Sequence, residues 1–111
     1  MNKKTHKVFS DTAFQIIANR FKVLSDPSRL RILHALQGGE MNVSQLVAAT
    51  GISQANVSKH LALLLEAVMV GRRREGANVF YSIADSCVFE LCDLMCNKLQ
   101  REFDTRAAEF A

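Results

Sequence analysis

The amino-acid sequence predicts a mainly α-helical domain that contains one small β-hairpin. Apolar residues recur at the spacing of a helix through most of the chain, but residues 70–83 change to a period of two. Three signals for the start of a helix, at Asp26, Asn42 and Ser53, divide the helical part into separate segments. These observations favour several short helices packed together with a hairpin.

The length and composition predict one folded domain. A chain of 111 residues can bury one hydrophobic core, so we expect a single domain over residues 1–111, with residues 1–9 flexible. Apolar residues make up 49% of the chain and charged residues 23%, which is typical of a globular protein. The longest apolar stretch, residues 61–70, contains Glu66 and is too short to span a bilayer. We therefore expect a cytoplasmic protein that does not contact membranes.

Two helices are predicted in the first third of the chain. The first spans about residues 10–24, where one apolar stripe follows the helical period. Asp26 followed by Pro27 has the form of an N-cap and a first helical residue, so the second helix spans about residues 27–36. The apolar stripes of these two helices contain Phe14, Ile17, Phe21, Leu24, Leu30, Leu33 and Leu36.

Two further helices are predicted to follow with a tight turn between them. Asn42 and Gln45 have the form of a capping box, and Gly51 stands where a helix often ends, so a short helix covers about residues 43–50. Ser53 can cap the next helix. The core face of that helix is predicted to contain Val57, Leu61, Leu64, Leu65 and Val68.

The hairpin and one last helix complete the predicted fold. Gly76 and Asn78 tolerate positive φ and lie in the predicted tip of the hairpin, residues 75–78. The helical period resumes over about residues 86–103. A helix, a tight turn and a capped helix followed by a two-stranded wing form the winged helix-turn-helix arrangement, here with five helices. Its second motif helix enters the major groove, so double-stranded DNA is the expected partner.

The leading half of this recognition helix offers polar side chains for DNA. Gln54 and Asn56 are the best candidates for base recognition, because an amide can bond with two atoms of the adenine edge. Ser53, Ser58 and Lys59 are expected to contact phosphates, which fix the register without reading the sequence. Ser53 can cap the helix at the same time.

His60 and the three arginines of the wing are further candidates for DNA contacts. His60 can touch DNA or pack at the helix flank as a neutral imidazole, and the sequence leaves both roles open. In a strand, alternation sends Arg73 to the face opposite Arg72 and Arg74, so at least one of the three should face the DNA backbone or minor groove. Protection of an exposed strand edge against aggregation is the alternative role.

Three ordered blocks cover nearly the whole predicted domain. They are residues 21–33, FKVLSDPSRLRIL; residues 53–61, SQANVSKHL; and the wing residues 73–76, RREG, with 79–81, VFY. Together they resemble the ArsR/SmtB family of bacterial winged-helix repressors. The resemblance implies a homodimer that occupies a palindromic operator, represses transcription and leaves DNA when an inducer binds.

The first and last helices form the dimer interface in that family. The apolar stripes of the first and last predicted helices agree with such an interface, because they hold more apolar surface than the core of one such domain needs. The expected interface residues are Phe14, Ile17, Phe21, Leu91, Met95, Leu99 and Phe103. A symmetric dimer would present two recognition helices about one DNA turn apart.

The residues available to an inducer depart from the family pattern. Family members that detect soft metals often carry ELCVCDL at the third helix, whereas residues 40–46 here read EMNVSQL, so both thiols are missing. The family's zinc site uses Asp and His ligands on the last helix. His6, His34 and His60 all lie outside residues 86–104, so we do not expect that zinc site.

The last helix instead contains the chain's three cysteines. Cys92 and Cys96 are separated by one helical turn and share a face, but Cys87 lies about 140° around the helix from Cys92. Their thiolates could bind a soft metal or metalloid ion such as arsenite, or be oxidised to a disulfide or polysulfide link. Alternatively, the cysteines only pack the dimer interface, and the regulator does not respond through them.

Nothing in the sequence indicates an enzyme. No Ser-His-Asp set, glycine-rich phosphate loop or pair of catalytic carboxylates can be assembled from these residues. We therefore predict a dimeric DNA-binding transcriptional regulator, a repressor that an inducer releases from its operator. A module whose winged-helix surface binds another protein is the competing interpretation.

Overall fold

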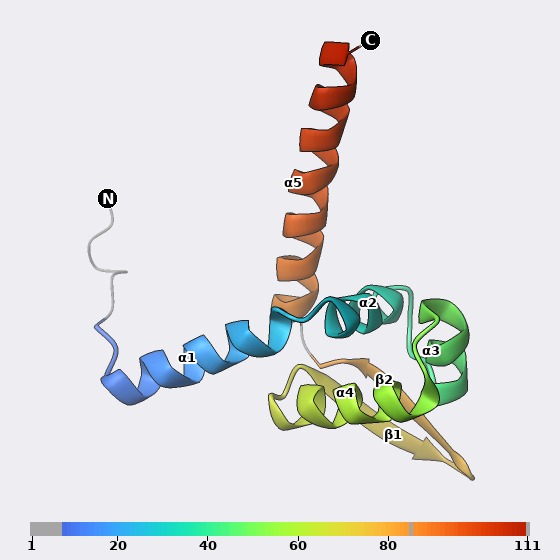
Figure 1. The fold of residues 1–111 in the computed structure, drawn as a ribbon. Helices are drawn as coiled ribbons and strands as arrows, with labels where there is room; N and C mark the ends of the chain where they lie inside the picture. Colours follow the sequence, from blue (N-terminus) through green and yellow to red (C-terminus); the bar gives the residue numbers. More distant parts are fainter. Residues whose placement is uncertain (1–7, 85, 111) are drawn as a thin grey trace.

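The computed structural model describes residues 8–84 and 86–110, and residues 1–7 of the stretch expected to be flexible lie outside it. The elements follow the predicted order and form a winged helix-turn-helix domain. They are α1 (Asp11–Leu24), α2 (Pro27–Leu36), α3 (Val43–Thr50), α4 (Gln54–Glu66), β1 (Val70–Glu75), β2 (Asn78–Ile83) and α5 (Ser86–Phe110) (Figure 1). The last helix continues beyond the predicted end at Phe103. The prediction ended where the apolar stripe stops, but no Gly or Pro follows Phe103 to end the helix.

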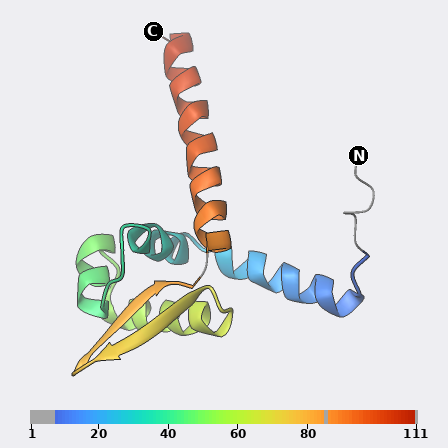
Figure 2. The same cartoon turned by 180° about the vertical axis from the view of Figure 1, so that it is seen from behind.

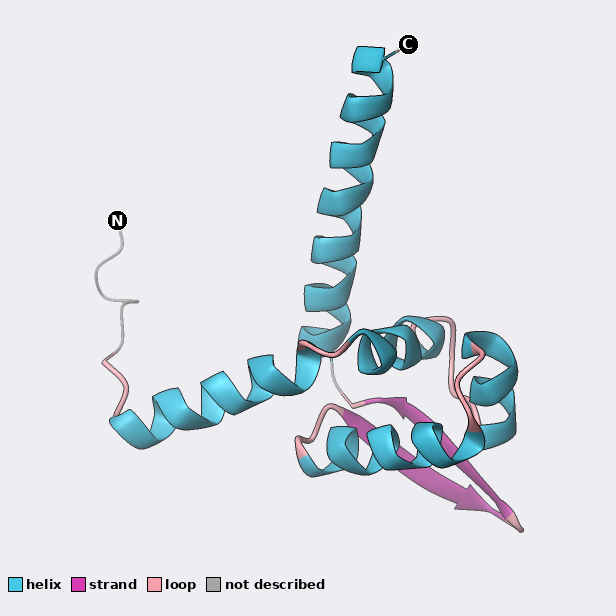
Figure 3. Ribbon diagram, in the orientation of Figure 1, coloured by secondary structure: helices cyan, strands magenta, loops and turns pink. Residues whose placement is uncertain are grey.

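One hydrophobic core holds α2, α3, α4 and the hairpin together as a compact body (Figure 3). Its fully buried side chains are Ile32, Leu33, Leu46, Val57, Leu61 and Leu64. The loop before α3 is joined to the wing by an isolated bridge between Met41 and Tyr81, whose backbone groups bond in both directions at 3.0 and 2.8 Å. The wing is therefore fastened to the body at its base and along one edge.

Local capping explains where the helices begin. The side chains of Ser10, Asp26, Asn42 and Ser53 each accept a hydrogen bond from a backbone N–H in the first turn, and Asn42 completes its capping box with Gln45. At α1, Phe9 and Phe14 pack edge to face across the cap with ring centroids 6.0 Å apart. This pair is a hydrophobic staple, which fixes the direction in which the chain enters α1.

The end of α4 differs from the prediction. The helix stops at Glu66, and the N–H groups of Val68 and Met69 bond to the carbonyls of Leu65 and Leu64, as in a Schellman motif. Val68 therefore adopts φ 59° and is 62% exposed, so its assignment to the core face was wrong. Leu65 is half-buried against the core, as predicted. Leu30, predicted on the apolar face of α2, is also exposed.

The helices α1 and α5 project from the body in different directions (Figures 1 and 2). No residue of α1 is buried, whereas Val88 at the base of α5 belongs to the core. The molecule consequently extends over 52 × 49 Å but is only 20 Å thick. In residues 8–84 and 86–110, no helix has the length and hydropathy needed to cross a membrane.

Candidate nucleic-acid interface

The recognition helix α4 is anchored by one face and leaves the other face open. Val57, Leu61 and Leu64 are buried, which turns the polar side chains of its leading half outward. Gln54, Asn56, Ser58 and Lys59 are all exposed. Gly51, in the left-handed region with φ 75°, ends α3 and allows α4 to begin after a very short turn.

Ser53 caps α4, with its hydroxyl accepting a bond of 3.3 Å from the N–H of Asn56. The first N–H groups of a helix have no acceptor within the helix, and the helix dipole favours negative charge at the same end. The leading end of α4 can therefore offer backbone donors to a phosphate beside the exposed side chains of Gln54 and Lys59.

His60 has a protein partner on the body. Its ring is half-buried, and Nδ1 lies 3.2 Å from Nη1 of Arg29 on α2. Arginine can only donate, so Nδ1 of His60 must accept and the proton of the neutral ring must be on Nε2. Of the two roles that the sequence left open, this geometry matches packing at the flank of α4.

The strand register divides the three arginines of the wing between its two faces. Arg72 pairs with Tyr81 and Arg74 with Val79, whereas Arg73 pairs with Phe80. Directly paired residues share a face of a sheet. Tyr81 packs against the core, so Arg72 and Arg74 lie on the face of the wing turned toward the core.

Arg73 is bound to other side chains on the opposite face. Its Nε donates to Glu40 at 2.9 Å, its Nη2 pairs with the other oxygen of Glu40, and its Nη1 donates to Glu75 at 3.2 Å. Its guanidinium also stacks over Phe80, 4.9 Å from the ring centroid. The bonds from Arg73 lower the pKa of Glu40 and raise that of Arg73. Arg73 thus ties the wing to the loop before α3, a contact that the sequence interpretation missed.

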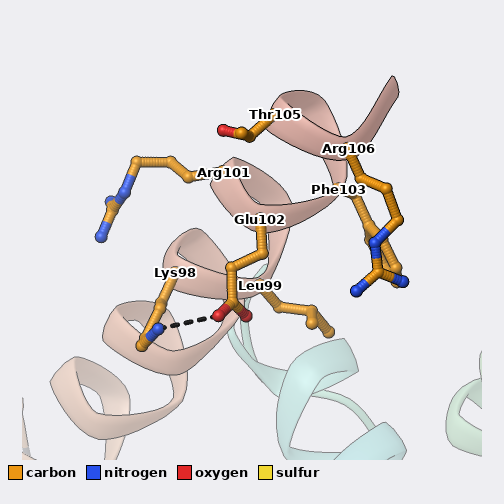
Figure 4. A pocket seen from close by; sticks show the side chains of 7 residues that line it. All are labelled: Lys98, Leu99, Arg101, Glu102, Phe103, Thr105 and Arg106. Carbon is orange, nitrogen blue, oxygen red and sulfur yellow. Dashed lines mark hydrogen bonds and ion pairs between the residues drawn. The ribbon is translucent and has the colours of Figure 1, made fainter. Parts of the chain in front are cut away.

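The projecting helices expose every residue predicted for the dimer interface. These are Phe14, Ile17 and Phe21 on α1, and Leu91, Met95, Leu99 and Phe103 on α5. Figure 4 shows that Leu99 and Phe103 leave α5 on one side, whereas Arg101 leaves it on the other. Ile16, Phe89 and Leu94 add to this exposed apolar surface, although the selected helical stripes omitted them.

The three cysteines lie in different surroundings along α5. Cys87 and Cys96 are exposed, and Cys92 is half-buried against the core. Burial raises the pKa of the Cys92 thiol, and the neighbouring Cys96 raises it further. Within the described part of the chain, no three His, Cys, Asp or Glu side chains are grouped closely enough to hold a metal ion. A site formed by all three thiolates of one protomer therefore does not fit.

Comparison with known sequences gives one family. Residues 26–70 match the family model described as bacterial regulatory protein, arsR family. Over 94 residues, the chain is 40% identical to the transcriptional repressor SmtB homolog of Synechocystis, an alignment that covers 85% of this chain and 71% of the relative.

Two solved structures are similar over most of the chain. One is the homodimeric winged helix-turn-helix DNA-binding domain Mb0332 from Mycobacterium bovis, with 29% identity and a TM-score of 0.78, covering 90% of this chain and 95% of that domain. The other is the antimony-specific transcriptional repressor AntR, also with 29% identity and a TM-score of 0.78, covering 92% of this chain and 93% of AntR. The likeness thus extends from the DNA-binding body into the projecting helices.

Proposed function

Because this chain belongs to the ArsR family, whose members are DNA-binding transcriptional regulators and not enzymes, we propose that it is a homodimeric repressor. It would bind a palindromic operator in the bacterial cytoplasm and leave it when an inducer binds. One observation carries the proposal. The helix α4, with its exposed polar leading half, packs against β1 of a wing whose Arg72 and Arg74 share the face turned toward the body.

The proposed contacts divide into base recognition and backbone contacts. Gln54 and Asn56 would read base edges, since both amides are exposed at the leading end of α4. The proposed phosphate and minor-groove contacts are Ser53, Ser58, Lys59, Arg72 and Arg74. His60 and Arg73 leave this set, because their side chains are held by other residues of the protein.

The proposed dimer would use the exposed faces of α1 and α5. Large apolar side chains continue along both helices, and such a surface is typical of an interface between protein chains. The homodimeric relative from Mycobacterium bovis supports this assembly. Two-fold symmetry would then place two α4 helices on half-sites about 34 Å apart.

The test begins with duplexes selected from random sequence by the wild-type protein. Binding to the selected duplex is then measured at several salt concentrations for Gln54→Ala and Asn56→Ala. Each substitution should weaken specific binding by about tenfold and leave binding to unrelated duplex almost unchanged, because amides read bases and not phosphates. Ala48→Ser, at an exposed position of α3, is the control and should bind like the wild type. Failure to select any sequence, or equal losses on both duplexes, would reject this assignment.

For the inducer, the pair Cys92 and Cys96 is the proposed sensor. They lie one turn apart on α5, where burial first and the neighbouring Cys96 second raise the pKa of the Cys92 thiol. Peroxide would join the two sulfurs as both thiols lose a proton and peroxide is reduced to water. A polysulfide would instead place one or more of its sulfur atoms between them, its S–S bonds breaking with release of sulfide. Because Cys92 packs against the core, the new link would disturb the junction of α5 with the body.

This proposal is tested by release from the selected operator. Peroxide, polysulfide and arsenite are added separately to the wild type and to the variants Cys92→Ser and Cys96→Ser. Peroxide or polysulfide should release the wild type, and neither variant should respond. Cys87→Ser is the matched control and should respond like the wild type. If no reagent releases the wild type, or if both variants respond unchanged, the cysteines only pack the protein.

A further inference from the structure

The side chain of Arg29 links three helices behind the DNA-facing side of α4. Its Nε donates to the carbonyl oxygen of Val23 in the last turn of α1 at 2.7 Å. Its Nη1 lies 3.2 Å from Nδ1 of His60, in the middle of α4. Arg29 itself stands in the first turn of α2. One guanidinium therefore connects a projecting helix, the body and the recognition helix.

The start of α2 holds Arg29 in place. The carboxylate of Asp26 accepts bonds from the backbone N–H groups of Ser28 at 2.8 Å and Arg29 at 3.1 Å. The bond from the Arg29 N–H and the positive charge of its side chain keep the pKa of Asp26 below its ordinary value. Asp26 stays ionised near neutral pH, so the cap that orients Arg29 is present under ordinary conditions.

The geometry requires an arginine and not merely a positive charge. The planar guanidinium presents donors in fixed directions, so Nε can donate to Val23 of α1 while Nη1 donates to His60 of α4. A lysine ammonium on a flexible stem would keep the charge but not this fixed fork. In this bond Nδ1 of His60 accepts, so the ring N–H is on Nε2.

From these contacts we propose that Arg29 is a positioning residue that sets the angle between α4 and the dimer-forming helix α1. The proposal rests on the proposed function, in which α1 is fixed against a partner subunit. The angle between α1 and α4 would then determine the separation and rotation of the two recognition helices. The separation and rotation of the two recognition helices must match the spacing between the half-sites of the operator. Each added base pair changes that spacing by about 3.4 Å and about 35°.

The test measures discrimination between operator spacings. The selected operator is compared with versions that gain or lose one central base pair. The wild type should lose about tenfold or more in affinity on either change, because the two helices no longer match both half-sites. Arg29→Lys should reduce this ratio to about twofold to threefold, since the angle is no longer fixed. Its binding to unrelated duplex and its salt dependence should remain those of the wild type.

Two further variants separate positioning from other roles. Arg31→Lys is the matched control, because Arg31 is exposed and lies about 200° around α2 from Arg29, and it should keep the wild-type ratio. His60→Leu removes only the bond to α4 and should relax spacing discrimination like Arg29→Lys. If urea unfolding shows that Arg29→Lys does not fold, His60→Leu alone tests whether the Arg29–His60 bond controls spacing discrimination. In the wild type, ¹⁵N spectra of the imidazole should show the proton on Nε2 of His60.

The outcomes distinguish this proposal from the proposed function. Wild-type spacing discrimination in both Arg29→Lys and His60→Leu would overturn the positioning role, as would a proton on Nδ1 of His60. If Arg29→Lys keeps the ratio and Arg29→Gln weakens binding to all duplexes with a smaller salt slope, Arg29 contacts phosphate instead. A wild type that binds all spacings equally would overturn the palindromic dimer as well, and the positioning role with it.

Discussion

The packed body and the two projecting helices carry similar apolar stripes but use them differently. In the body, Leu61 and Leu64 are almost completely buried, whereas Phe14 on α1 and Leu99 on α5 are each about half exposed. The same helical period therefore marks a buried face in the body and an exposed face on the projecting helices. The body completes its core within one chain, and the projecting helices leave apolar surface that a second chain can cover. Periodicity identifies a helix but does not identify its partner.

The largest expected effect comes from opening the core of the body. Leu64→Ala removes a side chain with 0% exposure, so it should lower the free energy of unfolding by about 3 kcal/mol through lost burial and a new cavity. Urea unfolding measures this change. Leu30→Ala, at an exposed position of α2, is the matched control and should cost less than about 1 kcal/mol. Equal losses for the two variants would contradict the division between body and surface.

A charge on the exposed face of α5 should instead affect assembly. Leu99→Asp should convert the dimer to monomers and weaken binding to the two half-sites by about a hundredfold, because the second contact is no longer intramolecular. Light scattering during gel filtration gives the mass, and mobility shift gives the affinity. Lys98→Ala, which removes only an exposed ion pair with Glu102 (Figure 4), is the control and should remain dimeric. A Leu99→Asp dimer with wild-type affinity would exclude this face.

The junction between the body and the projecting helices contains a strained residue. Val68 has φ 59° and lines an apolar groove together with Phe21 of α1 and Leu91 of α5. A β-branched side chain is disfavoured in this conformation, so Val68→Gly should raise the free energy of unfolding by about 1 kcal/mol. Val68→Ala keeps a Cβ and should change stability much less. An equal gain in Val68→Gly and Val68→Ala would mean that the added stability does not come from removing the Cβ at this left-handed backbone position.

The wing offers a comparison among three neighbouring arginines. Arg72→Gln and Arg74→Gln should each reduce the salt slope of DNA binding by about one unit, as expected for loss of a phosphate contact. Over the range from 50 to 200 mM salt, one unit corresponds to about a fourfold change in relative affinity. Arg73→Gln is the matched control, because Arg73 is bound to Glu40 and Glu75, and its slope should not change. A reduced slope in Arg73→Gln alone would reverse the assignment of the two faces.

Local chemistry made much of this architecture predictable. Asp26, Asn42 and Ser53 each bond to N–H groups two or three residues ahead, so the helix starts can be read from neighbouring residues. The end of α4 could not be predicted in this way, because Val68 occupies a position that normally favours glycine.

The candidate site was predictable in part for the same reason. Exposure of Gln54 and Asn56 follows from the helical period of α4, which turns Val57 and Leu61 inward. The partners of His60 and Arg73 are remote in sequence, however, because Arg29 and Glu40 are separated from them by 31 and 33 positions. Only the fold brings such pairs together, so the protein partners of His60 and Arg73 could not be predicted from neighbouring residues.

The smallest expected effect concerns the ion pair that ties the wing to the body. The bond from Arg73 lowers the pKa of Glu40 below 4.5, so the folded state binds the Glu40 proton less readily than the unfolded chain does. Its stabilisation is therefore present above pH 4.5 and is lost as the pH falls through the lowered pKa. Glu40→Gln should be slightly less stable than the wild type at pH 7, and this difference should vanish in acid.

Urea unfolding of both proteins between pH 7 and pH 3 measures that difference. Because both groups are exposed at the surface, raising the salt concentration at pH 7 should also reduce it. Glu90→Gln, on the exposed part of α5, controls for removal of one negative charge and should not reproduce the pH dependence. A difference between Glu40→Gln and the wild type that persists unchanged at pH 3 would have to come from packing, and the wing would then be held mainly by the bridge between Met41 and Tyr81.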